Sequence, residues 1–303
     1  MADPTFSDVI VIPVHNRRET TLRTLRALAD DGVFGWAAVL VVDDGSTDGT
    51  AGAGRAVFPA VHWLQGDGTW WWAGAIRHGM EWALARGAAR IFWLNDDCIP
   101  PRGGLARLRD FVTRENTASW IDAQTSAGRI YGAHRKTPMR VRRCTPEEER
   151  RGKVDTFSGN CVCLPRLWVE RVGLPDDRSF PHGLADFDYG LRLHAAGAVL
   201  RPLPDAVAVN AEPAADASAS WLRGTRPMRS IWRDFSSPRS FFYFPAWRRF
   251  ALRHWGPVWG WAVFLAPYKR WVLIAVVRTV VPGLGRARAQ PRTSGHPPAP
   301  NKT

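Results

Sequence analysis

Short apolar runs that end abruptly in polar side chains constrain the fold of this chain more than any other feature. Three such runs, residues 9–14, 39–42 and 91–94, have the length of a strand and contain no charged residue. An uninterrupted apolar run is typical of a strand buried on both faces of a parallel sheet. Between the first two runs, leucines at positions 22, 25 and 28 have a helical spacing. Strands that alternate with helices predict right-handed βαβ units. We therefore expect an α/β fold whose mostly parallel sheet is flanked by helices.

Side chains capable of chemistry follow each run directly. They are His15 and Asn16 after the first run, Asp43 and Asp44 after the second, and Asn95, Asp96 and Asp97 after the third. The carboxyl ends of parallel strands meet at one edge of the sheet, where ligands bind. Adjacent carboxylates repel each other unless a cation lies between them, and hard divalent cations prefer oxygen ligands. The pattern indicates a Mg²⁺ or Mn²⁺ site that holds a diphosphate; the alternative is a solvated acidic turn.

Several later segments extend the expected site. A Gly-rich loop containing Gly68 leads into three consecutive tryptophans, which cannot all face one core from one helix, and we expect Trp72 to stack on a sugar. Arg77 either reaches the diphosphate or lies on a plain helix surface. The segment Ser158, Gly159 and Asn160 is expected to border an acceptor site, because glycine lets a ligand approach the backbone.

The chain divides by composition. Residues 1–212 hold 26 Lys/Arg and 26 Asp/Glu, whereas residues 213–303 hold 15 Lys/Arg and two Asp, which accounts for the net charge of +13. We expect an α/β domain at 1–212, a basic, Trp-rich helical extension at 213–285 and a disordered tail at 286–303. Residues 119–153 are expected to form short antiparallel strands and a mobile loop, and 211–220 a linker.

A basic and Trp-rich extension suggests an anionic partner surface. Its longest uncharged run is fourteen residues, 255–268, whereas spanning a bilayer takes about 20. We expect an interfacial segment on an anionic membrane, and the alternative is a helical cap packed on the α/β domain. The start of the chain has no signal-peptide pattern, and four cysteines without metal spacing suggest reduced thiols in a cytosolic protein.

The order of the motifs P-V-H-N-R, V-V-D-D-G-S-T-D, G-D-G-T-W-W-W-A-G-A-I, L-N-D-D and A-D-F-D-Y-G-L-R resembles family 2 glycosyltransferases with a GT-A fold. The resemblance covers roughly residues 8–212 and is nearest to the bacterial rhamnosyl- and galactofuranosyl-transferase branches. It implies an inverting, metal-dependent transfer from a nucleotide-diphosphate-sugar donor. The acceptor would be a glycan or glycolipid of the cell envelope, at the cytoplasmic face of the membrane, in cell-wall or polysaccharide synthesis.

The resemblance also implies roles on the donor side. Pro13, His15 and Asn16 would line the base and ribose pocket, and Asp43 or Asp44 would hydrogen-bond the nucleobase. Asn95, Asp96 and Asp97 stand where the family has its D-X-D metal motif. Because the first member is Asn here, Asp97 becomes the metal ligand and Asp96 a ribose or second contact.

Further roles follow for the later motifs. Asp186 occupies the position of the catalytic base, although Ala185 replaces the acidic residue that precedes it in the family. Asp188 would bind the acceptor or orient Asp186. Many relatives have a metal-binding His where this chain has Asn210, and an amide oxygen can also bind a hard cation.

Two other functional classes fit the sequence less well than a glycosyltransferase does. A nucleotidyltransferase of related fold needs a Gly-rich basic phosphate loop after the first strand, and His15-Asn16-Arg17 is not one. A nucleic-acid-binding protein driven by the basic extension leaves the acidic sites unexplained, and its sign would be salt-dependent DNA binding. We therefore expect no nucleic-acid partner.

Overall fold

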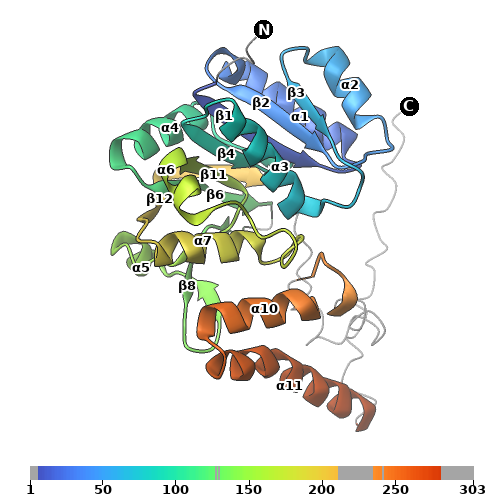
Figure 1. Ribbon diagram of the computed structural model, residues 1–303, viewed down its shortest axis with the longest axis vertical. Coiled ribbons are helices and arrows are strands. Elements are labelled where there is room, and N and C mark those ends of the chain that lie inside the picture. Colours follow the sequence, from blue (N-terminus) through green and yellow to red (C-terminus); the bar gives the residue numbers. More distant parts are fainter. Residues whose placement is uncertain (1–5, 127, 129, 211–234, 241, 281–303) are drawn as a thin grey trace, which may run out of the picture.

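A computed structural model describes residues 6–126, 128, 130–210, 235–240 and 242–280 (Figure 1). The linker expected at 211–220 and the disordered tail expected at 286–303 lie outside the described residues. The helices are η1 (Val33–Gly35), α1 (Arg18–Asp30), α2 (Thr50–Val57), α3 (Trp71–Ala85), α4 (Gly104–Glu115), α5 (Pro146–Arg150), α6 (Arg166–Val172), α7 (Ala185–Ala195), α10 (Phe244–Trp255) and α11 (Trp259–Val280).

The large sheet has the strand order β3-β2-β1-β4-β11-β6-β12-β5, with β7 beside β6. Its strands are β1 (Asp8–Val14), β2 (Ala38–Asp43), β3 (His62–Gln65), β4 (Arg90–Leu94), β5 (Cys98–Ile99), β6 (Ala118–Thr125), β7 (Ile130–Tyr131), β11 (Cys161–Pro165) and β12 (Leu200–Asn210). The first four strands are parallel, β11 lies antiparallel between β4 and β6, and β6 and β12 are parallel. The order reverses at β1, between β2 and β4, which is where a crevice opens in folds of this class.

Helices cover both faces of the sheet, and β1 and β2 are therefore buried along their whole length. Leucines of α1 and α4 pack on one face with Ile10, Ile12 and Phe92. On the other face, α3, α6 and α7 pack on Val11 and Trp93. This three-layer arrangement confirms the expected α/β class.

The middle of the chain is more regular than we expected. Residues 118–125 form β6, a largely buried strand of eight residues in the large sheet, whereas we expected short antiparallel strands and a mobile loop from residue 119 on. Behind it, β8 (Ala133–Lys136), β9 (Val141–Arg143) and β10 (Thr156–Phe157) make a separate three-stranded sheet. β12 has a register shift between Pro202 and Val207 where it pairs with β6.

The C-terminal helix α10 packs directly on the α/β domain. Ala246 and Phe250 of α10 share a hydrophobic cluster with Phe180, Leu184 and Phe187, at the start of α7. Figure 1 shows α10 between α7 and α11, with α11 as the outermost helix. Within the described part of the chain, no helix has both the length and the apolar character needed to cross a bilayer.

Candidate active site

The loops after β1, β2 and β3 meet at one edge of the sheet, and Asp44 ties two of them together. Its carboxylate accepts hydrogen bonds from the backbone amides of Gly68 and Trp71, both at 2.8 Å. Asp43 accepts one from the amide of Ser46 at 2.9 Å. The other oxygen of Asp43 is buried and has no hydrogen-bond partner among the described residues. A buried acceptor without a partner is costly, so this oxygen is suited to a donor group of a ligand.

The loop after β1 presents His15 and Asn16 beside this acidic turn. His15 Nδ1 lies 2.6 Å from the carbonyl oxygen of Asp44. Because a carbonyl only accepts, Nδ1 carries the proton and Nε2 accepts from the Asn16 amide at 3.1 Å. Asn16 has a left-handed φ of 53° and its side chain accepts from the amide of Thr47 at 2.7 Å. Both residues are exposed, so their free faces can line a ligand pocket.

The acidic pair after β4 already has a cation, and it belongs to the chain. The guanidinium of Arg17 lies 3.3 Å from a carboxylate oxygen of Asp96 and 3.2 Å from one of Asp97. An arginine side chain therefore supplies the positive charge that we expected between these adjacent carboxylates. Asp96 is 4% exposed, which leaves Asp97 as the more accessible of the two.

Asn210 lies close to this pair, as the sequence led us to expect. It is the last residue of β12, and its register partner in β5 is Cys98, which directly follows Asp97. The side-chain oxygen of Asn210 is buried and without a hydrogen-bond partner among the described residues. Those residues include no group of three His, Cys, Asp or Glu side chains arranged for a metal. Mg²⁺ is usually held by one or two carboxylates together with substrate phosphates, so Asp97 and Asn210 fit an ion that a bound diphosphate completes.

A chain of hydrogen bonds connects the acidic edge with the start of α7. The indole of Trp72 donates to the Asn95 side-chain oxygen at 2.8 Å. The side-chain NH₂ of Asn95 in turn donates to the side-chain oxygen of Asn160 at 2.9 Å. The backbone amide of Gly159 then donates to Asp186 at 2.9 Å. A methyl group at Gly159 would lie 3.0 Å from both Asp186 and the Trp72 ring. The close approach explains why glycine stands there.

Asp186 is partly buried and lies in the first turn of α7. Burial raises its pKa to about 6, although hydrogen bonds from the backbone amides of Gly159 and Phe187 act in the opposite direction. Each carboxylate oxygen accepts one of these amides, and a second lone pair on each stays available. A carboxylate with this pKa is ionised near neutral pH yet accepts a proton readily.

Asp188 is not an acceptor contact, which corrects one of our expectations. Its side chain is completely buried, with Arg192 at 3.0 Å, Arg253 at 2.8 Å and His254 at 2.9 Å. Burial alone would raise its pKa, but the hydrogen bond from His254 and the two guanidinium charges hold the pKa below its usual range. Arg253 also pairs with Asp176. Asp188 therefore anchors α10 to α7, the helix whose second residue is Asp186.

The remaining expected site residues lie at different depths. Pro13 is buried within β1. Arg77 makes ion pairs with Glu81 at 3.1 Å and Asp177 at 3.0 Å, so its contact with a diphosphate stays a prediction. The expected role of Ser158 likewise stays a prediction; that residue is 8% exposed.

Sequence reasoning missed two sets of residues that shape the site. Arg17 is the last residue of the P-V-H-N-R motif, and its position shortly after a strand at the acidic edge was the available signal. Arg253 and His254 left no such signal, because they lie 65 and 66 residues from their partner Asp188.

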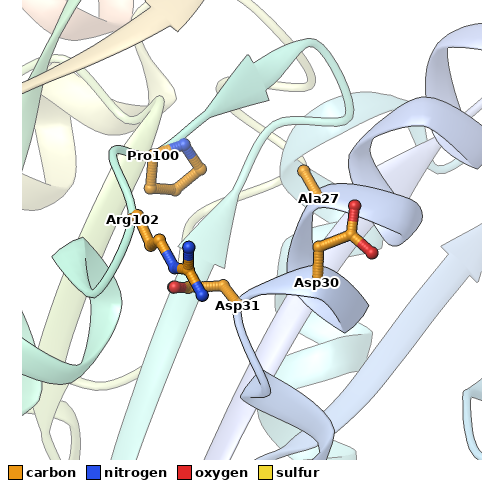
Figure 2. A pocket seen from close by; sticks show the side chains of 5 residues that line it. All are labelled: Ala27, Asp30, Asp31, Pro100 and Arg102. Atoms are coloured by element: carbon orange, nitrogen blue, oxygen red, sulfur yellow. The ribbon is translucent and has the colours of Figure 1, made fainter.

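A separate pocket is lined by other residues, at the end of α1 and after β5. Figure 2 shows Ala27, Asp30 and Asp31 at the end of α1 facing Pro100 and Arg102. None of the expected site residues lines this pocket, and it plays no part in the site.

Comparisons with known proteins agree with this geometry. The family model described as Glycosyl transferase family 2 matches residues 9–170. No curated protein matches the chain.

Solved structures resemble the fold at low sequence identity. A structure of GalNAc-T7 with UDP, GalNAc and Mn²⁺ superimposes with a TM-score of 0.56 at 16% identity, covering 91% of this chain and 58% of the other. A mannosyltransferase, PcManGT from Pyrobaculum calidifontis, with GDP-Man and Mn²⁺, gives 0.54 at 17% identity, covering 92% and 88%. TarS from S. aureus gives 0.55 at 12% identity, covering 82% and 39%. The chain thus spans little more than half of GalNAc-T7 and less than half of TarS. These likenesses concern the fold, and they confirm the expected GT-A architecture.

Proposed function

Since this chain belongs to glycosyl transferase family 2, we propose that it moves a sugar from a nucleotide-diphosphate-sugar donor to a hydroxyl group of a glycan or glycolipid, with inversion at the anomeric carbon. The proposal depends above all on the environment of Asp186. A single carboxylate with a pKa of about 6 lies at the start of α7, linked through Gly159, Asn160 and Asn95 to the acidic sheet edge. A general base and a cation site that holds the diphosphate are the two parts that such a transfer needs.

The donor would bind across the ends of β1, β2 and β4. The partnerless oxygen of Asp43 is placed to accept a hydrogen bond from the nucleobase or ribose, beside His15 and Asn16. Two similarly folded enzymes are named with UDP or GDP-Man, which supports a nucleoside diphosphate as the leaving group.

Asp97 and Asn210 would hold the divalent cation, with the diphosphate as the other source of oxygen ligands. A bound Mg²⁺ or Mn²⁺ compensates the charge of the departing nucleoside diphosphate. Mn²⁺ in the names of two similarly folded enzymes supports this cofactor. Arg17 has to release Asp97 for the cation to enter, because its guanidinium lies 3.2 Å from that carboxylate.

Asp186 would act as the general base. Its carboxylate takes the proton of the acceptor hydroxyl as that oxygen attacks the anomeric carbon. The amides of Gly159 and Phe187 hold the carboxylate in one orientation, so the open lone pairs face a fixed direction. Trp72, whose ring lies next to Gly159, is placed to contact the transferred sugar.

A kinetic comparison of Asp186→Asn with the wild type tests this role. The substitution keeps the shape of the side chain and removes its basicity, so kcat should fall by about 10²–10⁴-fold. The dissociation constant of the donor should stay within about twofold, because the proposed donor contacts lie at the ends of β1, β2 and β4 and Asp186 lies in α7. A variant that keeps kcat and loses donor affinity would show that Asp186 belongs to the donor pocket.

The acceptor is proposed to be a lipid-linked or cell-envelope glycan at the cytoplasmic face of the membrane, as in cell-wall or polysaccharide synthesis. The basic C-terminal extension supports it, since 15 Lys/Arg against two Asp in residues 213–303 favour an anionic surface. The protein would then work as a peripheral membrane enzyme.

A further inference from the structure

The outermost helix, α11, has an inner face that packs tightly on α10. Val263 and Phe264 are 0% and 2% exposed and share a small core with Ala251 of α10. At Gly260 the two helices approach so closely that a side-chain carbon would lie 2.6 Å from the Ala251 carbonyl oxygen. One face of α11 is therefore a packing face.

The opposite face of α11 is also apolar, yet nothing in the described chain covers it. Trp261, Leu265 and Leu273 are 45%, 54% and 62% exposed, and Val258, just before the helix, is 84% exposed. Steps of four and eight residues place the three helical side chains on one stripe. A helix that is apolar on both faces is normally buried or in contact with lipid.

The charged side chains of α10 and α11 all have one sign. No Asp or Glu follows Asp234 anywhere in the sequence. Arg248 and Arg249 of α10 and Lys269 of α11 are exposed. Lys269 lies four residues from Leu265 and from Leu273, so it belongs to the stripe itself. Interleaved Trp, Leu and basic side chains are typical of helices that lie in the interface of an anionic bilayer.

The helix pair is also held firmly to the α/β domain. Arg253 and His254 of α10 contact the buried Asp188. On the other side, Lys136 donates to the His254 carbonyl at 2.7 Å, and Trp255 donates to the Thr137 carbonyl at 2.8 Å. The inner helix α10 caps the domain, and α11 is the outer helix of the pair in Figure 1. Capping and membrane binding, which the sequence presented as alternatives, are thus assigned to different helices of one pair.

We propose that the outward stripe of α11, formed by Trp261, Leu265 and Leu273, docks on an anionic lipid surface together with the exposed Val258 just before the helix. The exposed Arg248, Arg249 and Lys269 attract the headgroups, and the apolar side chains enter the interface without spanning it. This proposal rests on the proposed function for its biological purpose, which is to hold the base at the start of α7 near a membrane-bound acceptor. Its test needs no sugar donor.

Flotation of the full chain with vesicles tests the surface directly. We expect binding to vesicles of phosphatidylcholine with 30% phosphatidylglycerol, little binding to pure phosphatidylcholine, and progressive release as NaCl rises from about 50 to 500 mM. The double variant Trp261→Glu with Leu265→Glu should lower the partition coefficient at least tenfold. The matched control is Val57→Glu with Leu167→Glu, two side chains 50% and 55% exposed on α2 and α6, and it should bind as the wild type does.

The basic side chains are tested separately. Arg248→Glu with Arg249→Glu should weaken binding and flatten the salt dependence, whereas Arg23→Glu with Arg26→Glu on α1 should change neither. If the Trp261 and Leu265 double variant melts early, the milder Leu265→Gln replaces it, with an expected several-fold loss.

Three results would overturn the proposal. The first is a wild-type chain that binds neither vesicle type, and the second is equal binding by the stripe variant and its control. The third is a wild-type dimer that the stripe substitutions make monomeric, which would assign the stripe to a second copy of the chain. Donor binding, measured on the same variants, should be unchanged, so a failure here is separate from a failure of the proposed function.

Discussion

Lowering the pH from 7 to 5 should slow sugar transfer about tenfold, because the base would be protonated in this interval. Burial raises the pKa of Asp186 to about 6 from an ordinary value of 3.8. With a pKa of about 6, about 90% of the groups are ionised at pH 7 and about 9% at pH 5. With the ordinary value, about 94% would still be ionised at pH 5, and the rate would hardly change. The raised pKa of Asp186 thus predicts a loss of rate between pH 7 and pH 5 that an ordinary pKa would not produce.

The assay is a pH series of kcat/KM between pH 5 and 8, followed by release of the nucleoside diphosphate. Donor affinity is measured by calorimetry at the same pH values, so that a change in binding is separated from a change in the base. Residual turnover of Asp186→Asn should be flat across the interval. A wild-type rate that is flat from pH 5 to 7, or an inflection that persists in Asp186→Asn, would refute the assignment of the raised pKa to the base.

Three other substitutions have definite expected outcomes. Asp43→Asn should weaken donor binding about 10–100-fold, since a hydrogen bond to a charged acceptor contributes about 1.5–3 kcal/mol; unchanged calorimetric affinity would remove Asp43 from the pocket. Gly159→Ala should lower kcat with little change in donor affinity, because the new methyl group lies 3.0 Å from Asp186; full activity would show that the neighbouring side chains shift freely. Asp188→Asn should destabilise the fold by about 3 kcal/mol in urea unfolding, because it removes the buried negative charge that Arg192 and Arg253 share; a loss below about 1 kcal/mol would contradict the anchoring role.

The sheet edge could be read from the sequence because its signals are local. The apolar runs of β1, β2 and β4 are continuous, and their polar ends follow at once, so Asp43 and Asp97 were placed correctly at one edge. The strand β6 was harder to predict, because Ser119, Asp122 and Gln124 interrupt its apolar pattern. Tertiary burial then decided its structure over local pattern.

Contacts between distant segments could not be predicted in this way. Asp188 looked like a second acidic residue of a catalytic motif, and only the folded chain brings Arg253 and His254 onto it. Arg17 likewise lies about 80 residues from Asp97 in the sequence. Charge pairing at such separations leaves no periodicity to read, so these side chains were assigned ligand roles or overlooked.

Turnover of a panel of nucleotide sugars by the full chain, with Mn²⁺ or with a chelator, tests the central claim most directly. The assay follows release of the nucleoside diphosphate and compares the wild type with Asp97→Asn, which removes the charge of the proposed metal ligand at the edge of the sheet. We predict that at least one donor is consumed with Mn²⁺ and that the chelator or the substitution lowers the rate more than about tenfold. A panel in which no donor is consumed with any divalent cation, or a wild-type rate that is equal in chelator, would contradict a metal-assisted transfer at this site.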